Sequence, residues 1–249
     1  ANPFVTALGH SKTASSRLTM TQAFNSLGTT VAPFFGAYLI FSGAEHSPVT
    51  DASATQMPYV MLAVVLLILA AIFAKLKLPD LGRASVVSQS NQSVWQHRHL
   101  KFGAIAIFLY VGAEVAIGSY LVNYFLDMNL VSVIKENGFM RTIAEGILNS
   151  GLVERDDKAV VGVFVTFYWS GAMIGRFAGA YLTRIIKPGK VLAIFATISI
   201  SLIILSVSTV GLVSMWSILA VGLFNSIMFP TIFTLAIDGI GHLKPKASG

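Results

Sequence analysis

Six long apolar stretches constrain this chain more than any other feature. An α-helix needs about 20 mostly apolar residues to cross a bilayer, and each stretch approaches or exceeds that length. Only 11% of the residues are charged, less than half the share that is usual in soluble domains. A soluble fold of 249 residues cannot bury this much continuous apolar surface. We therefore expect an all-α membrane protein with spans at roughly 18–42, 57–76, 102–126, 159–183, 191–210 and 213–238.

The charges between these spans alternate along the chain. One set of connecting segments carries twelve Lys or Arg residues and one acidic residue, whereas the other carries four Lys or Arg residues and eight acidic residues. Loops rich in Lys and Arg face the cytoplasm, so the first set is expected on the cytoplasmic side. The alternation requires no span to be moved, which supports the count of six.

Composition and charge placement exclude several other classes of protein. The formal net charge is +6, but the basic residues lie in loops beside apolar stretches, as expected near an anionic membrane surface, so no nucleic-acid partner is expected. Cysteine is absent, which excludes disulfides and thiolate metal sites. A membrane enzyme would need paired carboxylates or a His cluster, and the spans contain one Glu, one Asp and no His. We expect no enzymatic activity, no metal and no cofactor.

Two long segments separate the spans. The polar stretch 79–101 on the basic side is interpreted as a linker between two halves of the protein. The stretch 130–158 on the other side has apolar residues at the spacing of an amphipathic helix, which is predicted to lie over the membrane surface. Residues 2–10 also resemble residues 229–242, because each segment ends a span and leads into a basic turn. Such parallel halves occur in secondary transporters, and we expect further residues beyond both ends of the chain.

Several short stretches resemble the major facilitator superfamily, and within it the fucose/glucose/galactose permease branch. The stretches are 1–6 (ANPFVT), 17–19 (RLT), 22–28 (QAFNSLG), 110–115 (YVGAEV), 175–177 (GRF) and 222–226 (GLFNS). The resemblance covers essentially the whole chain, and the two stretches within residues 17–28 are its most specific part.

This resemblance implies a helical bundle of twelve spans in two halves. The chain would supply residues 1–78 of the N-terminal half (the end of span 4 and spans 5–6), the linker 79–101, and residues 102–249 as spans 7–10 of the C-terminal half. The implied function is proton-coupled uptake of a hexose such as glucose or galactose across the bacterial cytoplasmic membrane, by a monomer in lipid. Sodium is an alternative coupling ion. L-fucose, N-acetylglucosamine and a disaccharide are alternative substrates. A non-transporting fragment is a further alternative, since the family's proton-carrying acids are expected on spans 1 and 4.

Polar residues inside spans are costly unless they face a cavity or a partner. Gln22, Asn25 and Thr29 share one helix face, and amides offer the donors and acceptors that sugar hydroxyls need; helix packing is the alternative. Glu114 lies near the middle of its span and is a candidate for binding sugar or carrying a proton, or for a structural hydrogen bond.

The remaining candidates also have both a functional and a structural interpretation. The sugar-binding candidates are Tyr110, Asn123, Trp169 and Asn225, for which bundle packing is the alternative. Pro230 follows Asn225 and is expected to bend the last span, because proline lacks a backbone donor. Arg176 and Asp238 lie toward the cytoplasmic side and are expected to have a gating or structural role. A pair between them, directly or through backbone carbonyls, would lower the cost of burying each charge.

Overall fold

The computed structural model describes residues 2–41, 53–77, 93–148, 151–152, 156–240, 243 and 247. This part of the chain is helical and contains no strand. It divides into two compact units, one formed by residues 1–24 with 90–249 and the other by residues 25–89. Most of the predicted linker 79–101 lies outside the described residues, and the assignment of residues to two halves of a longer protein stays a prediction.

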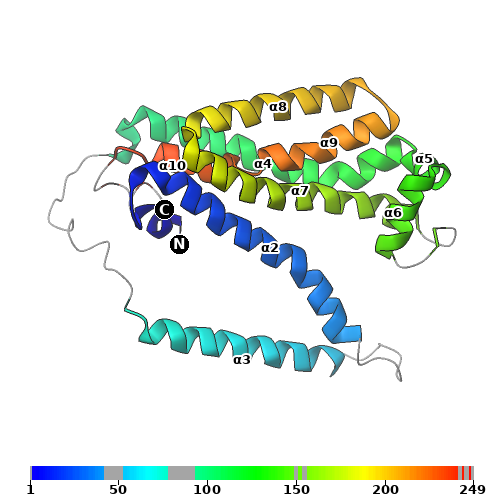
Figure 1. Ribbon diagram of the computed structural model, residues 1–249, viewed down its shortest axis with the longest axis horizontal. Coiled ribbons are helices and arrows are strands. Elements are labelled where there is room, and N and C mark those ends of the chain that lie inside the picture. Colours follow the sequence, from blue (N-terminus) through cyan, green and yellow to red (C-terminus); the bar gives the residue numbers. More distant parts are fainter. Residues whose placement is uncertain are drawn as a thin grey trace. The chain divides into compact units, whose positions relative to one another are not determined.

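The larger unit contains a bundle in which α4, α7, α8 and α9 lie side by side (Figure 1). Helices suit an apolar environment because they satisfy their own backbone groups. Pro188 begins α8, where a missing N–H costs nothing. The helical elements of this unit are α1 (Asn2–Ala7), η1 (Ser11–Thr13), the start of α2, η3 (Val94–Gln96), α4 (Arg98–Asp127), α5 (Leu130–Glu136), α6 (Gly138–Leu148), α7 (Asp157–Ile185), α8 (Pro188–Ser208), α9 (Gly211–Asn225) and α10 (Met228–Ala236).

The smaller unit contains the later part of α2 (Ala14–Phe41) and α3 (Ser53–Lys75). From Gln56 to Lys77 the side chains of this unit are exposed, apart from the half-buried Pro58. Most of them are apolar and they point to every side of α3. A helix that is apolar all round is covered by lipid or by other helices, so α3 has the surface of a membrane span.

Five helical segments in the described residues are long and apolar enough to cross a membrane, one fewer than the six predicted spans. They are Gln56–Lys75, Arg98–Asp127, Asp157–Ile185, Pro188–Ser208 and Gly211–Ala236. The predicted span 18–42 corresponds to α2, which is helical but not among the five. The first half of α2 is rich in Ser, Thr, Gln and Asn, and these residues lower its hydropathy. By length and composition, the predicted count is therefore one too high.

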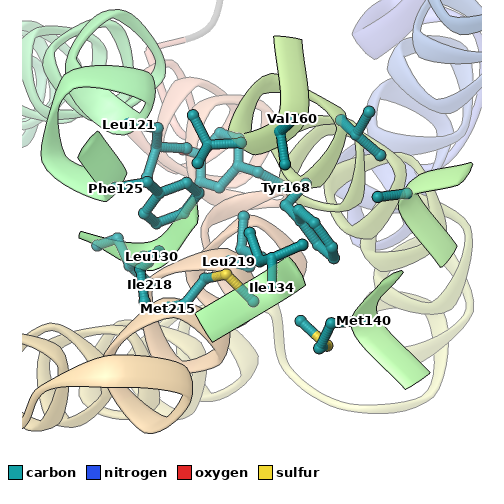
Figure 2. Packing of buried hydrophobic residues seen from close by; sticks show 14 of the residues in the cluster. Leu121, Phe125, Leu130, Ile134, Met140, Val160, Tyr168, Met215, Ile218 and Leu219 are labelled. Carbon is teal, nitrogen blue, oxygen red and sulfur yellow. The ribbon is translucent and has the colours of Figure 1, made fainter. Parts of the chain in front are cut away.

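The segment after α4 folds onto the bundle. It forms the two helices α5 and α6, and their residues Ile134, Met140 and Ala144 are buried in one core with Phe125 of α4 and Phe164 of α7. Figure 2 shows these two helices contributing Ile134 and Met140 to the cluster. The prediction of an amphipathic helix here is confirmed, and its apolar face packs against α4, α7 and α9. Its position over the membrane surface stays a prediction.

Three glycines allow α7 and α9 to approach each other closely. A Cβ atom on Gly171 would lie 3.3 Å from the backbone nitrogen of Leu223. A Cβ on Gly175 would clash with the Leu223 carbonyl oxygen, and one on Gly222 would clash with the Tyr168 carbonyl oxygen. Small residues are the usual means by which membrane helices bring their backbones together, so this contact depends on the absence of side chains.

We predict that Gly175→Ala destabilises the bundle, although alanine normally favours a helix over glycine by about 1 kcal/mol. The added methyl group would force α7 and α9 apart, at a cost of about 1–3 kcal/mol. Gly162→Ala is the matched control on the same helix, because no atom lies within 4 Å of its Cβ position. Thermal unfolding in detergent should give a lower Tm for Gly175→Ala alone. Equal Tm values for the two variants would contradict the predicted clash.

Candidate functional site

A charged pair joins two helices inside the bundle. Glu114 lies on α4 and Arg176 on α7, and Arg176 Nη2 is 3.8 Å from Glu114 Oε1. Each side chain is 17% exposed, and both helices are long and apolar enough to span a membrane. Because an isolated charge in such a helix is costly, the two opposite charges lower the cost of burying each other.

The same arginine contacts a break in the last span. Helix α9 ends at Asn225 and α10 begins at Met228. Pro230 has no N–H, so the Ser226 carbonyl lacks the donor that a continuous α-helix supplies four residues later. Arg176 Nε donates a hydrogen bond to this carbonyl over 3.3 Å. One guanidinium therefore contacts a carboxylate and a backbone carbonyl that proline has freed.

Two tyrosines and one amide lie near this charged pair. Asn225 Nδ2 donates a hydrogen bond to the Tyr168 hydroxyl over 2.7 Å, and both side chains are buried. Tyr110 precedes Glu114 by about one turn of α4, and Tyr168 precedes Arg176 by about two turns of α7. Within the described residues, the Tyr110 hydroxyl and Asn225 Oδ1 are buried and have no partner in hydrogen-bond geometry. Buried polar atoms without partners are costly, so a hydrogen bond to either atom would stabilise the bundle.

An aromatic face adjoins these polar groups. Trp169 follows Tyr168 on α7, and its side chain is 45% exposed. A Cβ on Gly118 would lie 3.0 Å from Trp169 Cζ2, which places the indole against α4 one helical turn after Glu114. A half-exposed aromatic ring therefore lies close to the half-buried acid.

Together these groups suit a neutral ligand that carries many hydroxyls. The polar cluster, as we name Tyr110, Glu114, Tyr168, Arg176 and Asn225, offers hydrogen-bond donors and acceptors from three helices. The ring of Trp169 adds an apolar face for stacking. In the part of the chain that the structure describes, no group of three or more His, Cys, Asp or Glu side chains is placed to hold a metal ion.

Two candidate residues lie away from the polar cluster. Asn123 is exposed and follows Glu114 by nine residues on α4, about 13 Å along the helix at about 1.5 Å per residue. Asp238 is exposed beyond the end of α10. The ion pair that the structure shows for Arg176 is with Glu114, and the gating or structural role expected for Arg176 and Asp238 stays a prediction.

The three predicted sugar-binding residues on α2 differ in their surroundings. Gln22 is half-buried, and its Nε2 donates to Asn2 Oδ1 over 3.4 Å. Asn25 is exposed. Thr29 is also exposed, and its hydroxyl donates to the Ser26 carbonyl over 2.9 Å. Asn25 and Thr29 belong to the smaller unit, and sugar binding by all three residues stays a prediction.

Residues at opposite ends of the chain meet at the end of the bundle where the loops are basic. The hydroxyls of Ser15 and Thr234 share a hydrogen bond, and Ser16 Oγ donates to the Ala180 carbonyl over 2.6 Å. A pocket of about 160 Å³ adjoins this contact, and the residues lining it include Thr6, Lys12, Ser15, Thr234 and Asp238. The contact closes the larger unit on the side that the charge pattern assigns to the cytoplasm.

Sequence reasoning missed two features of this unit. The first is the stripe of glycines at 171, 175 and 179 on α7, which the repeated spacing of four residues could have revealed. The second is the role of Arg17, whose guanidinium donates hydrogen bonds to the carbonyls of Val5, Thr6 and His10. Arg17 therefore ties the end of α1 to the following turn. Every residue has a backbone carbonyl, so the sequence does not show which carbonyls accept hydrogen bonds from Arg17.

The chain was compared with known families, curated proteins and solved structures. The sequence pattern of the Major Facilitator Superfamily matches residues 4–249. A protein named glucose/galactose transporter, from Brucella abortus biovar 1 (strain 9-941), is 48% identical over 252 residues, which cover 100% of this chain and 56% of that protein. A protein named L-fucose-proton symporter, from Escherichia coli (strain K12), is 31% identical over 97% of this chain and 55% of that protein.

A crystal structure of the E. coli fucose:proton symporter is similar in fold. It matches with a TM-score of 0.78 at 27% identity, over 99% of this chain and 60% of that chain. This chain therefore spans just over half the length of the curated relatives and the solved structure that it matches.

We predict that Glu114→Gln destabilises the protein and that Asp238→Asn does not. Neutralising Glu114 leaves Arg176 without its charged partner, which costs about 3–5 kcal/mol for fully buried pairs and about 1–3 kcal/mol for this partly exposed one. Asp238 is exposed, so its neutralisation should change the free energy of unfolding by less than about 0.5 kcal/mol. Thermal unfolding in detergent measures both effects. A larger loss of Tm for Asp238→Asn would mean that Arg176 depends on Asp238 after all.

Proposed function

This chain belongs to the Major Facilitator Superfamily, and we propose that the complete protein is a secondary active transporter that takes up a hexose together with a proton. It is a multi-pass protein of the bacterial cytoplasmic membrane and a transporter, not an enzyme. The proposed substrates are glucose and galactose, because the relative with 48% identity is named a glucose/galactose transporter. The coupling ion is proposed from the relative named an L-fucose-proton symporter. We propose that the complete transporter is a monomer.

The observation that carries this proposal is the position of Trp169 beside Glu114 and the polar cluster. Transport of a sugar needs hydrogen-bonding groups and an aromatic surface within a largely apolar bundle. Trp169 supplies an exposed ring, and the Tyr110 hydroxyl and Asn225 Oδ1 supply polar atoms without partners among the described residues. We propose that the sugar ring stacks on Trp169 while its hydroxyls bind Glu114, Asn225 and Tyr110.

The remaining candidates are given secondary roles. Gln22, Asn25 and Thr29 on α2 stay proposed as sugar-binding residues, although the Gln22 amide is already bound to Asn2. Asn123 is exposed and remote along α4, so we propose that it contacts the sugar on its way in. Asp238 lines the pocket at the basic end, where a gating role fits better than sugar binding.

Glu114 is the residue of this chain proposed to take part in coupling. A carboxylate within a membrane span is a candidate proton carrier by default, and Arg176 is the opposite charge that lies beside it. Proton coupling is preferred over sodium coupling because of the name of the symporter relative. Unchanged uptake in the absence of a proton gradient would contradict it.

L-fucose is the second candidate substrate. The specific observations that favour it are the 31% identity to the protein named an L-fucose-proton symporter and the TM-score of 0.78 with a fucose:proton symporter. Glucose, galactose and fucose all present several hydroxyls around a ring, and the polar cluster does not distinguish among them.

The proposed function is tested by uptake of labelled sugars. The complete protein is reconstituted into liposomes with an acidic exterior, and labelled glucose, galactose and fucose are supplied separately. We expect accumulation of glucose or galactose that stops when an ionophore collapses the proton gradient. Accumulation of fucose alone would establish the second candidate, and no accumulation of any of the three sugars would contradict the proposed function.

We further predict that Trp169→Ala raises the KM for the transported sugar about two- to tenfold, since aromatic stacking contributes about 0.5–1.5 kcal/mol. Trp95→Ala is the matched control, because Trp95 is 57% exposed and lies in η3, outside the spans. Initial rates over a range of sugar concentrations measure the effect. Equal KM values for the two variants would exclude stacking on Trp169.

A further inference from the structure

The break between α9 and α10 has an unusual means of satisfying its backbone. Ser226 lies within the break and is fully buried. Its carbonyl cannot bond to Pro230, and a buried carbonyl without a partner is costly. The donor that replaces the missing N–H is the side chain of Arg176 from the neighbouring helix. The break is therefore stabilised by a residue outside its own helix.

Arg176 is held in this position by close packing. The adjacent Gly175 has its missing Cβ directed at the Leu223 carbonyl and the Ser226 hydroxyl. The Ser226 hydroxyl in turn donates to the Leu223 carbonyl over 2.7 Å. The α7 backbone thus lies directly against the break, and the guanidinium reaches Ser226 through Nε and Glu114 through Nη2.

We propose that Arg176 is a positioning residue that makes the shape of the α9–α10 break depend on the charge of Glu114. An ionised Glu114 attracts the guanidinium and keeps it over the break. When Glu114 takes a proton, or binds a sugar hydroxyl, this attraction weakens and the guanidinium is free to leave the Ser226 carbonyl. The break then loses its donor, and α10 changes its angle to α9. The role of this movement in transport rests on the proposed function.

Beside Glu114 and Arg176, the polar cluster contains the titratable side chains of Tyr110 on α4 and Tyr168 on α7. Both tyrosines are buried, and a tyrosine hydroxyl ionises far above neutral pH. Glu114 is the carboxylate of the polar cluster, and the proposed response depends on its charge.

The movement of α10 is tested by a distance between two spin labels. Val213 on α9 and Leu235 on α10 are both exposed, and the chain contains no cysteine, so Val213→Cys with Leu235→Cys places one label on each helix of the complete protein. Any cysteines elsewhere in the protein are first replaced. We expect the distance to differ between neutral and acidic pH. Glu114→Gln should give the acidic distance at both pH values, and Arg176→Gln should abolish the difference.

Three further variants separate this relay from a purely structural role. Pro230→Ala restores an N–H that can bond to Ser226, so the break should close and its distance should become independent of pH. In Arg176→Lys the ammonium group keeps the charge but contacts either Glu114 or the Ser226 carbonyl, not both. This variant should retain the fold, and its spin-label distance should not change with pH. Arg184→Gln is the matched control, because Arg184 is exposed on the same helix, and it should behave like the unchanged protein.

A double variant supplies the second readout. Arg176→Gln should lower Tm, and adding Pro230→Ala should recover at least half of that loss, because alanine supplies the donor that the arginine no longer provides. A pH-dependent distance that persists in Arg176→Gln, or strictly additive changes in Tm, would overturn the proposal. A pH-dependent distance without any sugar uptake would instead contradict the proposed function and leave this inference standing.

Discussion

The contact of Arg176 with Glu114 and with the Ser226 carbonyl is the interaction on which the larger unit depends. A guanidinium within an apolar bundle needs both an opposite charge and acceptors for its N–H groups, and this arginine finds them on two different elements. The contact requires that α7 and α9 approach closely, which Gly175 and Gly222 allow. It also requires a carbonyl without a helical partner, which Pro230 provides. Glycine packing, the helix break and the charged pair are therefore parts of one arrangement.

This arrangement determines where a ligand can bind. Polar groups from α4, α7 and α9 lie together around the charged pair, and the ring of Trp169 lies beside them. Elsewhere the helices present apolar surfaces, as α3 does on every side. A ligand with many hydroxyls finds donors, acceptors and a stacking surface together at the polar cluster, which is why we place the proposed sugar site there.

Much of the fold could be predicted from the sequence, because the length and hydropathy of a span are local properties. The spans of α3, α4, α7 and α8 and of α9 with α10 were predicted in this way. The count failed at α2, because the Ser, Thr, Gln and Asn residues in its first half lower the hydropathy of the helix. The importance of Glu114 was also predictable, since an acid within a span is conspicuous. The contact between Glu114 and Arg176 was not predicted, because the rotation and offset of neighbouring helices are tertiary properties.

A structure of the complete protein with bound glucose or galactose would test the proposed sugar site most directly. We predict that the sugar ring packs against Trp169 and that its hydroxyls form hydrogen bonds with Glu114 or Asn225. A sugar bound at another level of the bundle, with Trp169 and the polar cluster free of contact, would contradict the proposed site.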